Sequence, residues 1–105
     1  MKPKFGYLLP TRERIMGGQS EAVPLLTLAE KAEEKGYDSV WVGDSLLARP
    51  RHEPLTMLAA IAARTKTIEL GTAVLLPALR NPVVLAHLAA TVDQLSEGRL
   101  ILGVG

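Results

Sequence analysis

Short apolar runs alternate with longer amphipathic stretches along the whole chain. Four runs have the length of β-strands, and they occupy residues 5–9, 39–43, 68–76 and 99–104. The run at 39–43 is β-branched and aromatic with no polar alternation, which predicts a strand covered on both faces. A glycine or a proline closes each run, so each strand is predicted to end there.

The stretches between the strands carry apolar residues at helical spacing. In the first, apolar residues recur at i, i+3, i+4 and i+7 from Leu25, the stripe of an amphipathic helix. Gly36 is predicted to end this helix. A second helix is predicted to open at Pro54 and a third at Pro82, with Asn81 as the N-cap of the third. The inner stripe of the third helix is expected to consist of Leu85, Leu88, Ala89, Val92 and Leu95.

The resulting order is β-α-β-α-β-α-β, with residues 11–19 and 44–53 as polar loops and residues 1–105 as one domain. This alternation predicts an α/β fold with a parallel sheet and right-handed crossovers. Two architectures satisfy it, a doubly wound open sheet and an arc of a (β/α)8 barrel. The pattern of apolar residues alone does not choose between them.

Composition narrows the functional classes. Twelve basic residues are scattered among eleven acidic ones, and a net charge of +1 without a basic stripe argues against a nucleic-acid partner. The absence of cysteine excludes disulfides and thiolate sites, and no metal site is predicted. No stretch approaches the roughly 20 apolar residues of a membrane span, and the first apolar run is too short for a signal peptide. A cytoplasmic protein with no membrane partner is expected.

Three motifs occur in a fixed order. They are GYDSVWVGD at 36–44, then LGTAV at 70–74 with Pro77 and RNP at 80–82, then ATVDQLS at 90–96 with GR at 98–99 and LGVG at 102–105. Together they resemble the bacterial luciferase-like monooxygenase family. The resemblance implies a partial (β/α)8 TIM barrel and a flavin-dependent oxidoreductase that uses FMN or the deazaflavin coenzyme F420. Because a whole barrel needs about 250 residues, the chain resembles the N-terminal half of one.

The third strand is the candidate cofactor surface. Gly71, Thr72 and Ala73 are small enough for a planar ring to approach the backbone, and the apolar residues after them can wall the ring. The resemblance places a non-prolyl cis peptide at Ala73–Val74 and implies that Thr72 and Ala73 face the barrel interior. The predicted cofactor-binding residues are Thr72, Ala73, Val74 and Leu76. The alternative is that the small residues only mark a strand kinked for packing.

The second strand ends at the candidate catalytic residues, Asp44 and Ser45. Catalytic groups of barrels lie at the C-terminal ends of strands, where a carboxylate can accept a hydrogen bond or orient a proton carrier. Many relatives of the family carry histidine where Ser45 stands, so the strongest acid–base group is absent at this position. The alternative is that Asp44 only caps the loop.

The remaining charged residues are weaker candidates. Arginines fall on loops at the same predicted face, where they can bind an anionic tail or remain solvated, and none has an evident partner in the sequence. His52 lies in one of these loops, and His87 is predicted to point away from the core. Asp93 and Arg99 are predicted to pair and cap around the turn before the last strand. The loop arginines are Arg12, Arg14, Arg49, Arg51 and Arg80.

Two hypotheses of different class follow. In the first, the chain is the N-terminal part of a luciferase-like oxidoreductase that acts on a small organic substrate. In the second, it is a catalytically inactive half-barrel or scaffold that must pair with another chain. Four parallel barrel strands leave two unpaired edges and a bare apolar inner face, so a homo-oligomer is expected in either case.

Overall fold

The structure is a computed structural model and describes residues 2–105. The four predicted strands and three predicted helices are present, with two further short helices between them. In chain order the elements are β1 (Gly6–Leu8), α1 (Thr11–Met16), α2 (Val23–Glu34), β2 (Ser39–Val42), α3 (Pro54–Arg64), β3 (Glu69–Leu75), the 3-10 helix η1 (Pro77–Leu79), α4 (Pro82–Leu95) and β4 (Leu100–Val104).

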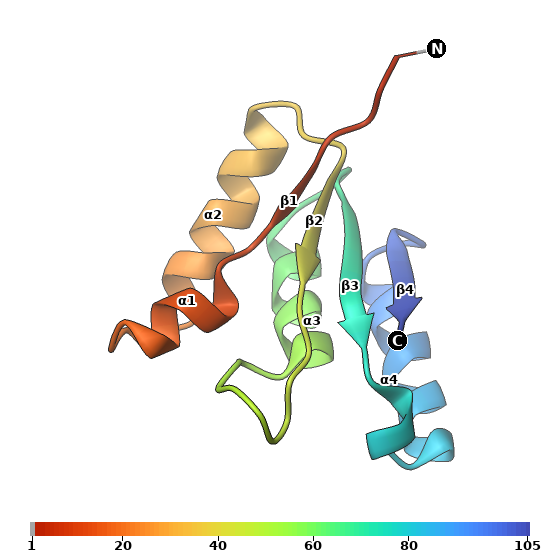
Figure 1. Ribbon diagram of the computed structural model, residues 1–105. Helices are drawn as coiled ribbons and strands as arrows, with labels where there is room; N and C mark the ends of the chain where they lie inside the picture. Colours follow the sequence, from red (N-terminus) through yellow and green to blue (C-terminus); the bar gives the residue numbers. More distant parts are fainter. Residues whose placement is uncertain (1) are drawn as a thin grey trace.

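The sheet decides between the two architectures. Its strands lie in the sequential order β1-β2-β3-β4, and all three neighbouring pairs are parallel. A doubly wound sheet reverses its strand order at a switch point, whereas a barrel adds each strand beside the previous one. The strand arrows in Figure 1 accordingly run in one direction, with α3 and α4 behind them and α1 and α2 to their left. The fold is therefore an arc of a (β/α)8 barrel.

Alternation along β2 separates the two faces of the sheet. Val40 and Val42 are fully buried beneath the helices, against apolar residues of α2 and α3 such as Leu25 and Leu58. Ser39 and Trp41 take the opposite side, where the indole Nε1–H donates to the Ser39 hydroxyl at 2.8 Å. We call this side, away from the helices, the open face.

The caps predicted from sequence are present. Asn81 accepts hydrogen bonds from the N–H groups of Val83 and Val84 at the start of α4, and Gly36 follows α2 with a φ of +88°. Glu53 also caps α3 by accepting from Thr56 N–H at 2.7 Å. These caps fix where each helix enters the layer behind the sheet.

Two expectations were wrong. Residues 11–16, predicted as loop, form α1, and Gly17 and Gly18 end it. This helix is only six residues long, too short to show a helical period in the sequence. The inner stripe of α4 is also incomplete: Val92 is buried, but Leu88 and Leu95 are about half exposed. α4 packs on α3 and on the edge strand β4, and part of its apolar stripe meets solvent.

Within residues 2–105, no helix has both the length and the apolar content needed to cross a bilayer. The same residues contain no group of three or more histidine, aspartate or glutamate side chains placed to hold a metal ion.

Candidate active site

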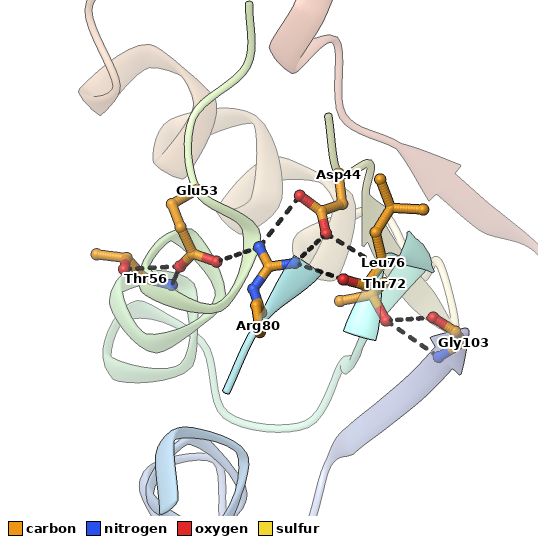
Figure 2. A network of polar contacts seen from close by, with 7 residues as sticks. All are labelled: Asp44, Glu53, Thr56, Thr72, Leu76, Arg80 and Gly103. Atoms are coloured by element: carbon orange, nitrogen blue, oxygen red, sulfur yellow. Dashed lines mark hydrogen bonds and ion pairs between the residues drawn. The ribbon is translucent and has the colours of Figure 1, made fainter. Parts of the chain in front are cut away.

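The C-terminal ends of β2 and β3 are joined by one buried carboxylate. Asp44 follows β2, and its side chain is 1% exposed. One of its oxygens accepts the backbone N–H of Leu76 at 2.9 Å, and both oxygens accept from the guanidinium of Arg80. Figure 2 shows this arrangement, with Arg80 between Asp44 and Glu53. The predicted residues Asp44 and Leu76, which are 32 positions apart in sequence, are therefore in direct contact.

The environment of Asp44 keeps it ionised. Burial by itself raises the pKa of this carboxyl, but the hydrogen bonds from Arg80 and Leu76 and the charges of Arg80 and Arg51 outweigh burial and lower the pKa. The hydrogen bonds that Arg80 donates to Asp44 in turn raise the pKa of Arg80 above its ordinary value. A carboxylate held as an anion by a bidentate arginine orients its partners rather than exchanging protons.

Arg80 extends the network to the start of α3. Its Nη2 donates to Glu53 at 3.0 Å, while the other oxygen of Glu53 accepts from the backbone and hydroxyl of Thr56. Arg80 also donates to the carbonyl of Leu76 at 3.2 Å. One guanidinium thus holds together the end of β2, the end of β3 and the first turn of α3, three segments at the rim of this barrel arc.

The predicted irregularity in β3 is confirmed. The Ala73–Val74 peptide is cis. Thr72 pairs with Leu102 and Leu75 pairs with Val104, so three steps along β3 face two steps along β4, which is a β-bulge.

Thr72 secures β4 beside the bulge. Its hydroxyl donates to the carbonyl of Gly103 at 2.8 Å and accepts the N–H of the same residue at 3.0 Å. A Cβ on Gly103 would stand 2.4 Å from the Thr72 carbonyl oxygen, and one on Gly105 would stand 2.6 Å from Val74. These two glycines therefore allow the close approach of β4, which gives them a packing role.

The open face beside the bulge has a flat apolar floor. The indole of Trp41 lies across Gly71 of β3 and Gly6 of β1, where a Cβ would come within 2.2 Å and 2.5 Å of the ring. Beyond this floor, toward the strand ends, Ala73 and Val74 are exposed. Small residues next to a broad indole leave a smooth surface at the C-terminal end of the sheet.

The orientation expected for Thr72 was wrong, whereas Ala73 lies on the expected side. Register aligns Thr72 with Val42, which is buried beneath the helices, and Thr72 is itself fully buried. Since neighbours along a strand point to opposite faces, both residues cannot line the open face. Leu76 is half-buried and contributes its backbone to the Asp44 network. The hydroxyl of Ser45 accepts the N–H of Arg49 at 3.1 Å within the exposed loop.

Sequence reasoning missed the partners of the arginines. Arg80 binds Asp44 and Glu53, although no partner was evident for it. The sequence did carry one signal for this contact. Arg80 directly precedes the cap of α4 in the RNP segment, so the start of α4 fixes the position of the Arg80 backbone. Arg99 is structural as predicted, but within residues 2–105 it bonds to the carbonyls of Ala62, Thr65 and Ile68, between α3 and β3, and not to Asp93. His87 is exposed on α4, in agreement with the prediction.

The comparisons with known proteins agree with this geometry. The sequence model of the luciferase-like monooxygenase family matches residues 1–105. The chain belongs to the luciferase-like monooxygenase family. Among curated relatives, an F420-dependent glucose-6-phosphate dehydrogenase of Amycolatopsis mediterranei is 49% identical over 88 residues, covering 77% of this chain and 26% of the relative. A 5,10-methylenetetrahydromethanopterin reductase of Methanolobus tindarius is 39% identical over 77 residues, covering 73% and 23%.

Solved structures of family members share the fold. A monooxygenase from Streptomyces bottropensis superposes with a TM-score of 0.85 at 35% identity, covering 98% of this chain and 33% of that one. The coenzyme F420-dependent tetrahydromethanopterin reductase of Methanopyrus kandleri gives 0.82 at 27% identity, covering 100% and 27%. The chain thus spans about a quarter to a third of the length of these relatives.

Proposed function

We propose that the chain forms part of a flavin-dependent oxidoreductase that acts on a small organic substrate, with F420 or FMN as the coenzyme. One observation carries the proposal. The exposed Ala73–Val74 segment lies at the carboxyl end of β3, beside the Asp44–Arg80 pair, in a chain that matches the family over its whole length. Barrel enzymes build their sites at this end of the strands.

The residues present fit a planar tricyclic ring. Such a ring needs a flat apolar surface with close access to backbone, and the open face offers exposed Ala73 beyond the Trp41 indole on Gly71. Bound there, the coenzyme supplies hydride transfer. The chain's own contribution is to shape that surface through the bulge and to hold it in place through Thr72, Asp44 and Arg80. Asp44 is proposed as a positioning residue.

The F420-dependent dehydrogenase and the F420-dependent reductase structure described above favour F420, and a second coenzyme has separate support. A type II Baeyer–Villiger monooxygenase from Pseudomonas putida, solved in complex with FMN, superposes with a TM-score of 0.81 at 25% identity. Ser45 does not titrate near neutrality, so proton transfer from this position is not part of the proposal.

The single tryptophan gives a direct test. Trp41 is the only indole in the chain and underlies the proposed ring surface, so F420 or FMN bound there quenches its fluorescence. We expect saturable quenching with a dissociation constant weaker than about 1 µM, because remote phosphate contacts normally supply much of the affinity. Ala73→Leu should weaken binding by at least about tenfold by filling the surface.

Ala86→Leu is the matched control, because Ala86 is exposed on α4, away from the open face. It should leave the quenching curve unchanged. If neither coenzyme quenches Trp41 in a saturable way, or if both leucine variants have the same effect, the ring site is not where we place it.

A second candidate function, a scaffold that pairs with another chain, is favoured by the sheet edges. Leu8 on β1 is 56% exposed and Val104 on β4 is 61% exposed, and both edge strands have an unpaired side within residues 2–105. We propose that the 105-residue chain forms a homo-oligomer through these edges. Light scattering on a size-exclusion column tests it, and a monomer at tens of micromolar would contradict it.

A further inference from the structure

Arg51 occupies an unusual position at the C-terminal end of β2. It comes from the loop before α3, and its guanidinium lies directly over the backbone of Gly43. A Cβ at Gly43 would stand 2.0 Å from Arg51 Nη1 and 2.6 Å from its Cζ. Only glycine leaves this space free. The close contact between the guanidinium and the strand therefore depends on both Gly43 and Arg51.

The guanidinium has few acceptors there. Its Nη1 donates to the hydroxyl of Thr11 at 3.4 Å, which is a long bond, and its Nε is buried without a hydrogen-bond partner among residues 2–105. An arginine offers five N–H donors and cannot shed its charge. A partly buried guanidinium with one weak bond carries an uncompensated desolvation cost, which an incoming acceptor removes.

The neighbouring acids are already engaged by other arginines. Arg80 binds Asp44 and Glu53, Arg12 binds Glu13, and Arg14 reaches Glu21 at 3.9 Å. Within residues 2–105, no carboxylate lies within 4.0 Å of the Arg51 guanidinium. Its charge is felt at a distance, since it helps to lower the pKa of Asp44. A positive charge at this end of the sheet is therefore left without a partner.

The location is next to the proposed ring surface. Trp41 pairs with Gly71 and Val42 with Thr72, and Gly43 and Ala73 are the residues that directly follow this last pair. Neighbouring strands are about 4.8 Å apart, and Gly43 shares the open face with Trp41 by alternation. A group bound to Arg51 thus lies one strand away from Ala73, within reach of a substrate that contacts both the ring and the guanidinium.

We propose that Arg51 binds an anionic oxygen of the substrate, a carboxylate or a phosphate, and that Gly43 leaves the space which the guanidinium occupies to do so. The proposal rests on the proposed function, which puts the substrate at this end of the sheet, and adds that the substrate is an anion. Arginine favours such groups because two of its N–H donors match two oxygens. Arg49, the other loop arginine without an ion pair, lies exposed.

Inorganic phosphate is the probe, added to the full 105-residue chain without coenzyme and followed by NMR of backbone amides. We expect saturable shifts at Gly43 and Ala73 and at the Nε–H of Arg51. Arg51→Gln should weaken phosphate binding about tenfold or more, which is the loss expected for a charge-assisted hydrogen bond. Arg51→Lys keeps the charge but loses the paired donors of the guanidinium. Its phosphate affinity should therefore fall between that of the parent chain and that of Arg51→Gln.

Two further variants distinguish a specific phosphate site from a nonspecific attraction of phosphate to positive charge. Gly43→Ala leaves Arg51 in the sequence but displaces its guanidinium, so phosphate binding should weaken as it does in Arg51→Gln. Arg64→Gln is the matched control, because Arg64 pairs with Glu30 at 2.7 Å between α2 and α3. It removes the same charge and should leave binding within about twofold, since exposed pairs contribute little.

The outcomes are separable from those of the coenzyme test. Riboflavin, which carries the ring without a phosphate, should not compete with phosphate if Arg51 binds a substrate anion. Competition by riboflavin would instead assign Arg51 to the ring and overturn the proposal. So would equal effects of Arg51→Gln and Arg64→Gln, or unaltered binding in Arg51→Gln. Phosphate binding with no Trp41 quenching by F420 or FMN would refute the proposed function while leaving the anion site intact.

Discussion

The two ends of the sheet each contain an arginine from a loop, and the two side chains are satisfied very differently. Arg99, near the start of β4, donates five hydrogen bonds to Ser96, Thr65, Ile68 and Ala62, four of them to backbone carbonyls. Arg51, at the far end of β2, donates one long bond to Thr11. The first arginine is saturated by the protein itself, and the second is not.

Glu33 is a negatively charged counterpart of Arg99, because its side chain is also hydrogen-bonded within the protein. At the same end as Arg99, it accepts the N–H groups of Lys66, Thr67 and Ile68 with one oxygen. At the N-terminal end of the sheet, these charged side chains therefore find their hydrogen-bond partners within the protein. This is expected, because that end of a barrel contributes to stability. At the C-terminal end, Asp44 and Arg80 fix the loops while Arg51 keeps donors free for a ligand.

Removing Arg99 should have the largest effect on stability. Arg99→Met keeps much of the apolar stem but leaves four carbonyls without their donor and the last turn of α3 uncapped. We expect a loss of about 3–4 kcal/mol in the free energy of unfolding, measured by urea denaturation. Arg64→Met, which removes an exposed pair with Glu30, should cost no more than about 1 kcal/mol. Equal losses in the two variants would remove the distinction drawn between the two ends.

Asp44→Asn should rank second. The amide cannot hold Arg80 as an ion pair, yet Glu53 still can, so a loss of about 2–3 kcal/mol at pH 7 is expected, below that for a fully broken buried pair. The fold lowers the pKa of Asp44. Its contribution is therefore complete above the ordinary aspartate pKa, about 3.9, and disappears as the pH falls through the lower folded value.

The variant should consequently lose less stability between pH 5 and pH 3 than the parent chain does, as measured by urea denaturation at each pH. Circular dichroism at pH 7 controls for the fold. Parallel pH profiles for Asp44→Asn and the parent would show that Asp44 is not the carboxylate that the fold stabilises.

Much of the fold was predictable from the sequence because its signals are local. Apolar periodicity located α2, and the Asn81-Pro82 pair located the start of α4 within one residue. The order of the strands was not local information. It came from the resemblance of the three motifs to a family, and the same resemblance placed the cis peptide at Ala73–Val74.

The side-chain partners in the candidate site could not be predicted in the same way. Asp44 and Arg80 are 36 residues apart, and their contact depends on the paths of two loops and on the end of β3. The face taken by Thr72 depends on the register of β3 with β2, which no spacing in the sequence reveals. Gly43 belongs to the motif at 36–44, but that motif does not pair it with Arg51, so their contact became visible only as a space that a Cβ would fill.

Glu33→Gln should have a moderate effect on the free energy of unfolding, and it provides a second test of the contrast between the two ends of the sheet. The amide oxygen can still accept from the loop at 66–68 but without a charge, so we expect a loss of about 1–2 kcal/mol by urea denaturation at pH 7. Although burial raises the pKa of Glu33, the three backbone hydrogen bonds outweigh it and lower the pKa. The loss should therefore shrink as the pH falls below about 4. Glu34→Gln, one residue along on the exposed side of α2, should change little, and a similar loss there would point to net charge instead.

Ser45→Ala should have the smallest effect, although Ser45 directly follows the most buried carboxylate of the site. Its hydroxyl accepts only the N–H of Arg49 within an exposed loop, and an exposed donor freed by the substitution bonds to water. We expect a change of at most about 0.5 kcal/mol in the free energy of unfolding, as for other surface substitutions. The quenching of Trp41 by F420 or FMN should likewise stay the same, because the hydroxyl of Ser45 is engaged within its own loop. A loss above about 1 kcal/mol would mean that the loop at 45–50 is held as firmly as the N-terminal end. Weaker quenching without a loss of stability would mean instead that Ser45 contacts the coenzyme directly, and the C-terminal end would then have a second functional side chain beside Arg51.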